Sequence, residues 1–358
     1  MLQLVSRKRL VLMRDDTNIL YTRGKYYISD DLGKKGRCLG AIPFHGIHTI
    51  GAQFPLIARI FRIEPRCAEW INKYCFIVAQ RGAVWHVNTQ TGLIHREHCF
   101  ETGMTAPLKF CTLKNMKNIS DGILYGTYRS KPNADVSIWH RNAKGEWRIV
   151  FTFPIGRVLH IHKLIPDYKK GRILALTGDS DSESGIWEFQ GSFEKPKLLL
   201  GGSQQYRACA AFPEDGHILY ATDTPLEKNY LYDYDENSGQ VKPLLQLPGP
   251  VIHSGSFFNN GEQVYCFSTS VEPDSRLHGI SYFLTRKLGA GVLTRQSHVF
   301  IGNRKRGFRE VCLFQKDIWP MALFEFGNVA FPDGESEHLY ACPRSVKYYS
   351  GKTVEVIP

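Results

Sequence analysis

HKLIPDYKKGRILALTGD, residues 162–179, consists of an apolar run, a polar turn and a second apolar run. The same pattern returns at AAFPEDGHILYATD (210–223), SFFNNGEQVYCFSTS (256–270) and NVAFPDGESEHLYACPR (328–344), and more loosely at 64–80 and 109–128. Each copy has the length and composition of two short antiparallel strands joined by a turn. An internal repeat of this size predicts a repetitive β architecture.

A second hairpin pattern recurs along the chain, and it combines an aromatic residue on a strand with a turn that contains glycine. Seven such hairpins occur, and their aromatic residues are Tyr27, Trp85, Trp139, Trp187, Tyr232, Tyr282 and Tyr348. Most neighbours in this series are about 45–58 residues apart, which is the range of four-stranded propeller blades. The longer last gap indicates an insertion near IGNRKRGF (301–308).

These repeats predict an all-β fold: one seven-bladed β-propeller of four-stranded antiparallel blades that spans residues 1–358. Six or eight blades are the alternatives. The N-terminal strand RLVLM (9–13) is expected to join the C-terminal blade and so close the ring.

The composition narrows the class of protein. The 358 residues are 43% hydrophobic and 22% charged, which is enough to fill a core and excludes global disorder. The formal net charge of +11 favours an anionic ligand, yet no segment resembles a nucleic-acid-binding module. No apolar run approaches the roughly 18 residues of a membrane span, and no signal peptide is visible, so a cytoplasmic location is the default expectation and non-classical export the alternative. The nine cysteines form no C-x-x-C pair, so reduced thiols are expected, and the oligomeric state stays open.

The repeat places residues in space, because the loops that enter the inner strands and the loops between the second and third strands open on one face of a propeller. The candidates that enter inner strands are His160, His162, Tyr206, Arg207, His253 and Lys316. The candidates on the other loops are Arg81, Tyr128, Arg129, Asp179, Asp181, Asp223, Glu272 and Arg344. So many ionisable and phenolic groups at equivalent points predict a polar ligand site at the mouth of the central channel.

His160 and His162 are the sharpest local pattern, because residues i and i+2 of a strand point to the same side. One interpretation is a divalent-metal site for zinc, manganese or calcium, completed by His253 or Asp179. Another is a catalytic base with an orienting partner, and the third is two histidines hydrogen-bonded in a channel wall.

The neighbouring candidates have alternatives of their own. One of Tyr206 and Arg207 should face the channel while the other packs, because adjacent strand residues point to opposite sides. Arg129 and Arg344 either clamp a carboxylate or are solvated loop arginines, and Asp223 either faces the ligand or caps a turn.

Two hairpins resemble the Asp-box (BNR) motif S-x-D-x-G-x-x-W of sialidase-like propellers. Ser29–Gly33 matches the first five positions, with Gly36 where tryptophan is expected, and Asn142–Trp147 is similar at a different spacing. Phe61–Pro65 is similar to the F-R-I-P segment of sialidases, with an extra glutamate. The arginine triad that this resemblance implies would be Arg129, Arg207 and Arg344.

The region from His160 to Asp223 resembles seven-bladed propellers of glycan-degrading systems, which include polysaccharide lyases and histidine-dependent glycoside hydrolases that act at uronic acids. The resemblance implies an axial site in which histidine, tyrosine and arginine carry the chemistry. It suggests a carbohydrate-active enzyme that cleaves an acidic, uronate-containing glycan.

The predicted roles follow from this function. In β-elimination, Arg207, Lys316 or a metal neutralises the carboxylate, and His160, His162, His253 or Tyr206 transfers protons. In hydrolysis, Asp179, Asp223 and Glu272 are the candidates. Tyr128, Arg129 and Arg344 would contact the substrate. The alternative is a non-catalytic propeller that binds a glycan or a protein partner.

Overall fold

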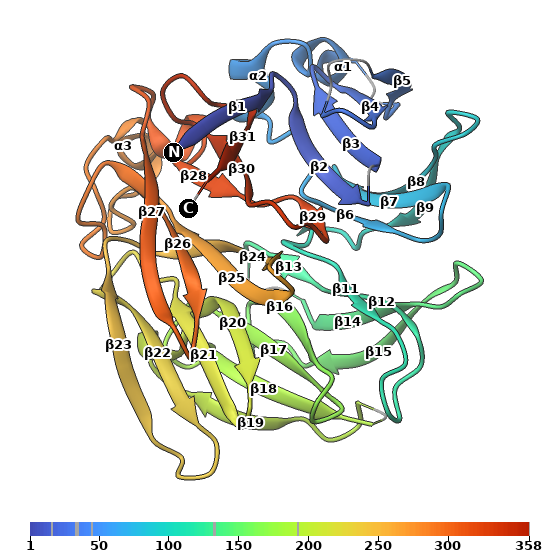
Figure 1. Ribbon diagram of the computed structural model, residues 1–358. Helices are drawn as coiled ribbons and strands as arrows, with labels where there is room; N and C mark the ends of the chain where they lie inside the picture. Colours follow the sequence, from blue (N-terminus) through green and yellow to red (C-terminus); the bar gives the residue numbers. More distant parts are fainter. Residues whose placement is uncertain (16, 33–35, 44–45, 132–133, 192, 358) are drawn as a thin grey trace.

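The computed structural model describes residues 1–15, 17–32, 36–43, 46–131, 134–191 and 193–357. Seven small antiparallel sheets surround a central axis, so the fold is the predicted seven-bladed β-propeller (Figure 1). Each sheet has four strands, and the first also pairs with β29 (Asp333–Gly334) as a parallel fifth strand.

The blades follow one another along the chain. The first three contain β2 (Arg9–Arg14), β3 (Thr17–Thr22), β4 (Lys25–Ser29) and β5 (Arg37–Ala41); β6 (Cys67–Trp70), β7 (Cys75–Gln80), β8 (Ala83–Asn88) and β9 (Ile94–Cys99); and β11 (Cys111–Leu113), β12 (Gly122–Gly126), β14 (Val136–Arg141) and β15 (Trp147–Phe153). The next two contain β16 (His160–Asp167), β17 (Arg172–Gly178), β18 (Gly185–Gln190) and β19 (Lys197–Gly201); and β20 (Ala208–Glu214), β21 (His217–Thr222), β22 (Asn229–Asp235) and β23 (Val241–Leu247). The last two contain β24 (Val251–Asn259), β25 (Glu262–Thr269), β26 (Gln296–Asn303) and β27 (Gly307–Gln315); and β28 (Asn328–Ala330), β30 (Tyr340–Arg344), β31 (Thr353–Val356) and β1 (Leu2–Ser6). A separate short pair joins β10 (Met104–Thr105) to β13 (Tyr128–Arg129).

The N-terminal strand of the last blade is β1, which pairs with β31 from Leu2 opposite Val356 to Ser6 opposite Thr353. In Figure 1 this blue strand lies beside the red C-terminal strands. The expectation that RLVLM (9–13) pairs there is wrong, because these residues form β2, the inner strand of the first blade. Residues 9–13 are all buried, which suits an inner strand covered by the neighbouring blades.

Seven hydrophobic clusters lie between the blades, one at each interface around the ring. The cluster between the third and fourth blades, for example, joins Leu124 and Ile138 to Ile161 and Ile173. The last interface joins Leu10 and its neighbours in the first blade to Ala330 and Cys342 in the seventh. Each blade therefore buries both faces, which is why the strands lack simple polar–apolar alternation.

The aromatic repeat has a structural cause. In β4, β8, β14, β18 and β22 the register to the outer strand shifts at the predicted aromatic residue, at Tyr27, Trp85, Trp139, Trp187 and Tyr232. In the sixth blade the equivalent residue is Phe300 of β26, and IGNRKRGF forms the β26–β27 turn rather than an insertion. Tyr282 instead lies in α3 (Gly279–Leu284), within the true insertion between β25 and β26. Tyr348 lies in an exposed turn before β31, so it anchors no blade.

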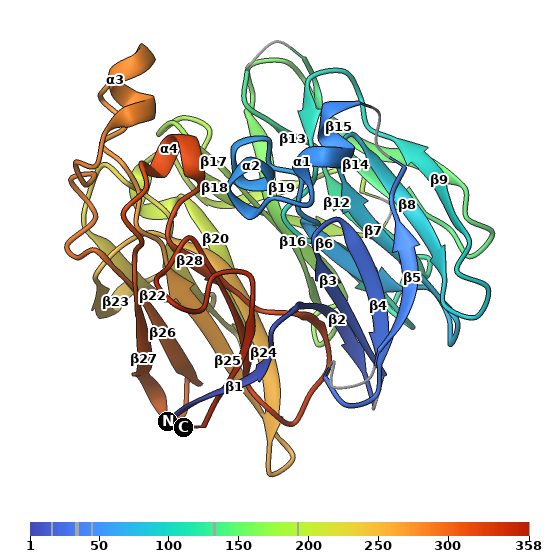
Figure 2. The ribbon, with the colours of Figure 1, turned by 90° about the horizontal axis from the view of Figure 1, so that it is seen from above.

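In the described part of the chain, four short α-helices stand on one face of the disc: α1 (Ile47–Gly51), α2 (Pro55–Ile60), α3 and α4 (Met321–Phe324) (Figure 2). Arg59 of α2 forms an ion pair of 2.8 Å with Asp317, and its Nε donates to the backbone oxygen of Phe324. These contacts tie segments from the start and the end of the chain together beside the axis. Among the described helices, none is long and apolar enough to cross a bilayer.

Four inner strands carry a β-bulge near the axis. In β2, β16, β20 and β24 one residue is skipped in the pairing to the second strand: Val11, His162, Cys209 and Ile252. A bulge changes the direction in which a side chain points, and all four of these residues line the axial channel. The bulges therefore fix which side chains reach the axis.

Candidate functional site

A cavity of about 550 Å³ opens on the axis, and residues of the α2, α3 and α4 segments line part of its wall. A smaller hollow of about 30 Å³ continues below it, and the two share Arg66, Cys209 and His253 among their lining residues. The predicted residues that line the larger cavity are Tyr128, Asp179, Arg207, Asp223, His253, Glu272 and Arg344. The structure thus brings together groups from five blades, although their chemical roles stay predictions.

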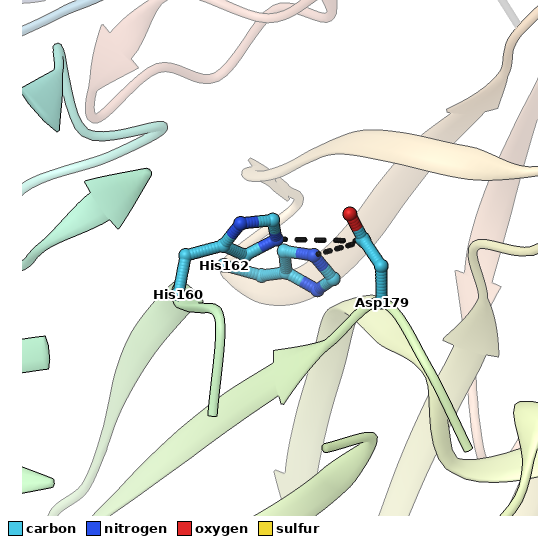
Figure 3. Close-up of side chains that lie close together, drawn as sticks. All are labelled: His160, His162 and Asp179. Carbon is cyan, nitrogen blue, oxygen red and sulfur yellow. Dashed lines mark ion pairs between the residues drawn. The ribbon is translucent and has the colours of Figure 1, made fainter. Parts of the chain in front are cut away.

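His160 and His162 of β16 meet Asp179, which directly follows β17 (Figure 3). Both Nε2 atoms lie 3.4 Å from the same oxygen, Oδ1 of Asp179. The two histidine side chains are 2% and 1% exposed, whereas the carboxylate is 38% exposed toward the cavity. The pair of rings is therefore fixed in the wall, with one carboxylate at the solvent side.

The hydrogen bonds of the two rings assign their tautomers. His160 Nδ1 lies 2.7 Å from the backbone oxygen of Arg129, and His162 Nδ1 lies 2.9 Å from that of Ala208. A carbonyl oxygen only accepts, so each Nδ1 carries a proton and each Nε2 of a neutral ring presents a lone pair. Burial lowers the pKa of His162 below its usual value, which favours the neutral ring.

His160, His162 and Asp179 therefore present lone pairs to one another, and none of the three donates a hydrogen bond to another member of the group. Nε2 of His160 is buried and has no hydrogen-bond partner among the described residues. Ligand atoms of His160, His162 and Asp179 all lie within 4.8 Å of one another. Imidazoles that donate Nδ1–H to a backbone carbonyl and aim Nε2 at a common point are typical of metal ligands. The donor set of two nitrogens and one carboxylate oxygen fits a divalent cation.

The surroundings hold the two rings in place. Tyr128 stacks on His160 with ring centroids 4.2 Å apart. On the other side, Gly178 leaves room for His162, because a Cβ there would lie 2.8 Å from its Cε1 atom. Neither ring can turn without displacing a neighbour.

Arg207 closes the site from the neighbouring blade. Its Nη2 lies 2.9 Å from Asp179 Oδ1 and 3.9 Å from Asp223 Oδ2. Although burial opposes ionisation, the pKa of the Asp179 carboxyl is held well below its usual range, and the Arg207 guanidinium is the neighbouring cation that stabilises its charge. Asp179 is therefore ionised at neutral pH.

Two further carboxyl groups stay protonated more readily. Burial raises the pKa of Asp223 well above its usual value, and the nearby Glu272 adds to the shift. Burial also raises the pKa of Glu272, which accepts a hydrogen bond from Ser270 Oγ. The cavity thus combines one ionised carboxylate with two carboxyls able to donate a proton.

Arg66 is a cavity residue that the sequence analysis missed. Its guanidinium lies over the ring of Tyr128 at 5.5 Å from the centroid and has no carboxylate partner among the described residues. By contrast, Arg344 is paired with Glu325 at 3.2 Å. The only indication of Arg66 in the sequence was that it directly precedes β6, the inner strand of the second blade.

Of the two predicted histidines of β16, His162 lines only the smaller hollow and His160 lines neither. Three further predicted residues also line neither of them. Tyr206 ends a short 3-10 helix (Gln204–Tyr206) and packs against the cluster between the fourth and fifth blades, so only Arg207 of that pair faces the axis. Arg129 is buried and its guanidinium is bonded to Glu101 and two backbone oxygens. Lys316 directly follows β27, the outer strand of the sixth blade, and bonds Asp317 and the backbone of Trp319.

Other predicted residues lie near the site without the expected contacts. His253 lines the cavity, but it belongs to neither of the clusters of described residues that could hold a cation. Burial, with Arg344 and Arg66 nearby, lowers its pKa well below the usual value. Asp181 and Arg81 line neither hollow: Asp181 accepts a hydrogen bond from Gln204, and Arg81 from the second blade bonds Phe61 and His48.

No protein-family model matches the chain, and no curated protein matches it. Its fold is similar to that of an oligogalacturonate lyase in complex with manganese, with 10% identity and a TM-score of 0.56 over 100% of this chain and 90% of that chain. The extracellular domain of a one-component system from B. thetaiotaomicron is 10% identical with a TM-score of 0.54, over 99% of this chain but 38% of that one. The WD40 propeller domain of Doa1 is 11% identical with a TM-score of 0.52, over 99% and 96% of the two chains. At these identities the likeness shows the fold alone.

The Asp-box resemblance stays a prediction. Both hairpins that suggested it are turns between the third and fourth strands of a blade. Ser29 Oγ donates to Asp31, and Asn142 Oδ1 accepts from the backbone of Lys144 and Glu146. Gly33 lies outside the described residues.

Proposed function

We propose that this protein is a metal-dependent enzyme that cleaves an acidic, uronate-containing glycan in the axial cavity by β-elimination. The observation that carries the proposal is the convergence of two imidazole Nε2 atoms on the Asp179 carboxylate. Because both rings carry their proton on Nδ1, neither Nε2 atom can donate a hydrogen bond to that carboxylate. The fold likeness to a manganese complex of an oligogalacturonate lyase supports the choice of cation and substrate class.

His160, His162 and Asp179 are the residues that would hold the cation. Of the ions that the sequence suggests, manganese and zinc accept imidazole nitrogen, whereas calcium prefers an all-oxygen site. The bound ion would supply a positive charge that binds the substrate carboxylate and acidifies the hydrogen on the adjacent carbon.

Arg66 is positioned to receive the other side of that carboxylate. Its guanidinium has five donors in a planar fork, faces the cavity, and stacks over Tyr128, which itself stacks on His160. Arg207, which the sequence analysis proposed for neutralising the substrate carboxylate, already forms an ion pair with Asp179.

Proton transfer falls to His253 and Glu272. The pKa of His253 is well below its usual value, so the neutral ring can take the C5 hydrogen of the uronate as a proton. The electron pair of the broken C5–H bond forms the C4=C5 double bond, and the C4–O bond to the leaving sugar breaks. Glu272, whose pKa is raised, donates the proton that the leaving oxygen requires.

The test is a screen of uronate oligosaccharides with protein stripped of metal and then reloaded with Mn²⁺. Elimination produces an unsaturated uronate that absorbs ultraviolet light, and this absorbance should require the metal and vanish in His160→Ala. New reducing ends without the absorbance would indicate hydrolysis at Asp223 and Glu272. Saturable binding without any product would indicate a non-catalytic binder.

The role of Arg66 has a matched pair of variants. Arg66→Lys keeps the charge but loses the bidentate fork, so kcat/KM should fall by about 10–100-fold while the affinity for Mn²⁺ stays unchanged. Arg309→Lys makes the same change on exposed β27 and should leave kcat/KM unaltered. Equal kcat/KM in both variants would contradict the role given to Arg66.

A further inference from the structure

A second group of ligand-type side chains shares His162 with the first. Ligand atoms of His162, Cys209 and Asp223 all lie within 4.8 Å of one another, and the three residues are 2%, 2% and 6% exposed. The Cys209 thiol donates to Asp223 Oδ2 at 3.1 Å. The group differs from the first because a sulfur atom replaces one imidazole.

The propeller itself places the thiol there. Cys209 is the bulge residue of β20, as His162 is the bulge residue of β16 in the preceding blade. The two side chains thus reach the axis from equivalent positions of neighbouring inner strands. Cys209 lines both the cavity and the hollow below it, so a cation that enters the cavity can reach the sulfur.

The geometry points to a second cation position formed by His162, Cys209 and Asp223, and we propose that it selects a thiophilic ion such as Zn²⁺ or Cd²⁺. Thiolate sulfur favours such ions, whereas the nitrogen and oxygen donors of the first position suit Mn²⁺. The proposal concerns binding and does not depend on the proposed glycan cleavage.

The chemistry of binding balances within this group. The bond between sulfur and the cation replaces the S–H bond, and the thiol proton leaves to solvent. Where Asp223 is protonated, its carboxyl proton leaves to solvent as well, so that the carboxylate can bind. His162 binds through Nε2, since its Nδ1–H is held by the backbone oxygen of Ala208. Asp223 turns from the acceptor of the thiol hydrogen into a ligand.

The two positions exclude each other. His162 has one free lone pair, on Nε2, and the same atom faces Asp179 in the first position. A thiophilic cation at the second position therefore removes one imidazole from the first. The structure predicts that Cd²⁺ or Zn²⁺ displaces Mn²⁺ without occupying the same set of ligands.

The experiment is a Cd²⁺ titration of reduced, metal-stripped protein. Binding is monitored through the ultraviolet charge-transfer band of cadmium bound to thiolate. Cys38 and Cys99 are exposed, so the titration uses a parent in which both are serine. One equivalent of Cd²⁺ should produce the band. Cys209→Ser should lose it, and its affinity for Cd²⁺ should fall by more than about tenfold, the least that loss of even an outer-sphere partner costs.

Cys67→Ser is the matched control, because Cys67 is another buried thiol at the start of an inner strand and bonds a backbone oxygen instead of a carboxylate. It should keep the band. His160→Ala should also keep the band while it loses Mn²⁺ binding, which separates this position from the first. A band that survives in Cys209→Ser, or that disappears equally in Cys67→Ser, would overturn the proposal.

Asp223→Asn decides the question if Cys209→Ser does not fold, as judged by circular dichroism. It leaves the thiol in place but removes the carboxylate, so the Cd²⁺ affinity should again fall more than about tenfold. Displacement of Mn²⁺ by Cd²⁺ should weaken in parallel. It is measured through the electron paramagnetic resonance signal of the released Mn²⁺. Unchanged affinity and unchanged displacement would refute the second position even if glycan cleavage is found.

Discussion

Replacement of Gly178 by alanine should separate metal binding from folding. Gly178 ends β17 with a backbone conformation open to any residue, so the sheet can accept a side chain there. A Cβ would lie 2.8 Å from Cε1 of His162, whereas carbon atoms pack at about 3.5 Å or more. The imidazole must therefore move by about 0.7 Å, several times the roughly 0.2 Å that metal–ligand distances tolerate.

The expected cost is a fall in Mn²⁺ affinity of about 10–100-fold, or about 1.4–2.7 kcal/mol, similar to the loss of a partner that orients a ligand. Isothermal titration calorimetry measures the affinity, and thermal unfolding without metal measures stability, which should fall by no more than the about 1–3 kcal/mol of local overpacking, with the fold retained. Gly36→Ala, on the exposed part of the first blade where a Cβ meets only ordinary contacts, is the control. If Gly178→Ala binds Mn²⁺ as tightly as the wild type, the position assigned to the His162 ring is wrong.

Three further predictions concern the fold. Burial opposes ionisation of Glu97, but Arg141 and other donors hold the pKa of its carboxyl below the usual 4.5. The ionised carboxylate therefore stabilises the fold above pH 4.5, and this stabilisation is lost as the pH falls through the lowered pKa. Glu97→Gln should unfold more easily in urea at neutral pH and should lose less stability on acidification. Arg172→Met leaves the carboxylates of Asp167 and Glu236 without their buried arginine partner. The free energy of unfolding in urea should fall by about 3–5 kcal/mol, and a fall below about 1 kcal/mol would contradict this prediction. Deletion of residues 1–6 removes the outer strand of the last blade and should lower the Tm, and an unchanged Tm would mean that ring closure there contributes nothing.

The repeat was visible in the sequence because each blade needs the same local chemistry. An aromatic side chain at the shifted register of the third strand recurs in six blades, five of them at the predicted residue, so its spacing predicts the blade. The prediction failed at Tyr282 and Tyr348, because an insertion with its own helix and a blade without that aromatic both interrupt the period. It also failed at RLVLM, because a short, partly exposed strand such as β1 has little pattern of its own.

The site was predictable where topology alone places residues. His160 and Asp179 lie at the ends of adjacent strands, so the repeat was enough to bring them together. The inward direction of Cys209 depends on a bulge, which the sequence does not mark. Lys316 was misplaced because the segment after it forms α4 rather than an inner strand, and Arg66 was missed because the register of the second blade was the loosest repeat.

The most direct test of the central claim is pulsed electron paramagnetic resonance of the protein loaded with one equivalent of Mn²⁺. Electron spin echo modulation detects nitrogen bound to manganese, and the structure predicts two imidazole nitrogens, from His160 and His162. His160→Ala should reduce the signal to that of one nitrogen or abolish binding. No nitrogen coupling in the wild type, or the same coupling in His160→Ala, would contradict the metal centre.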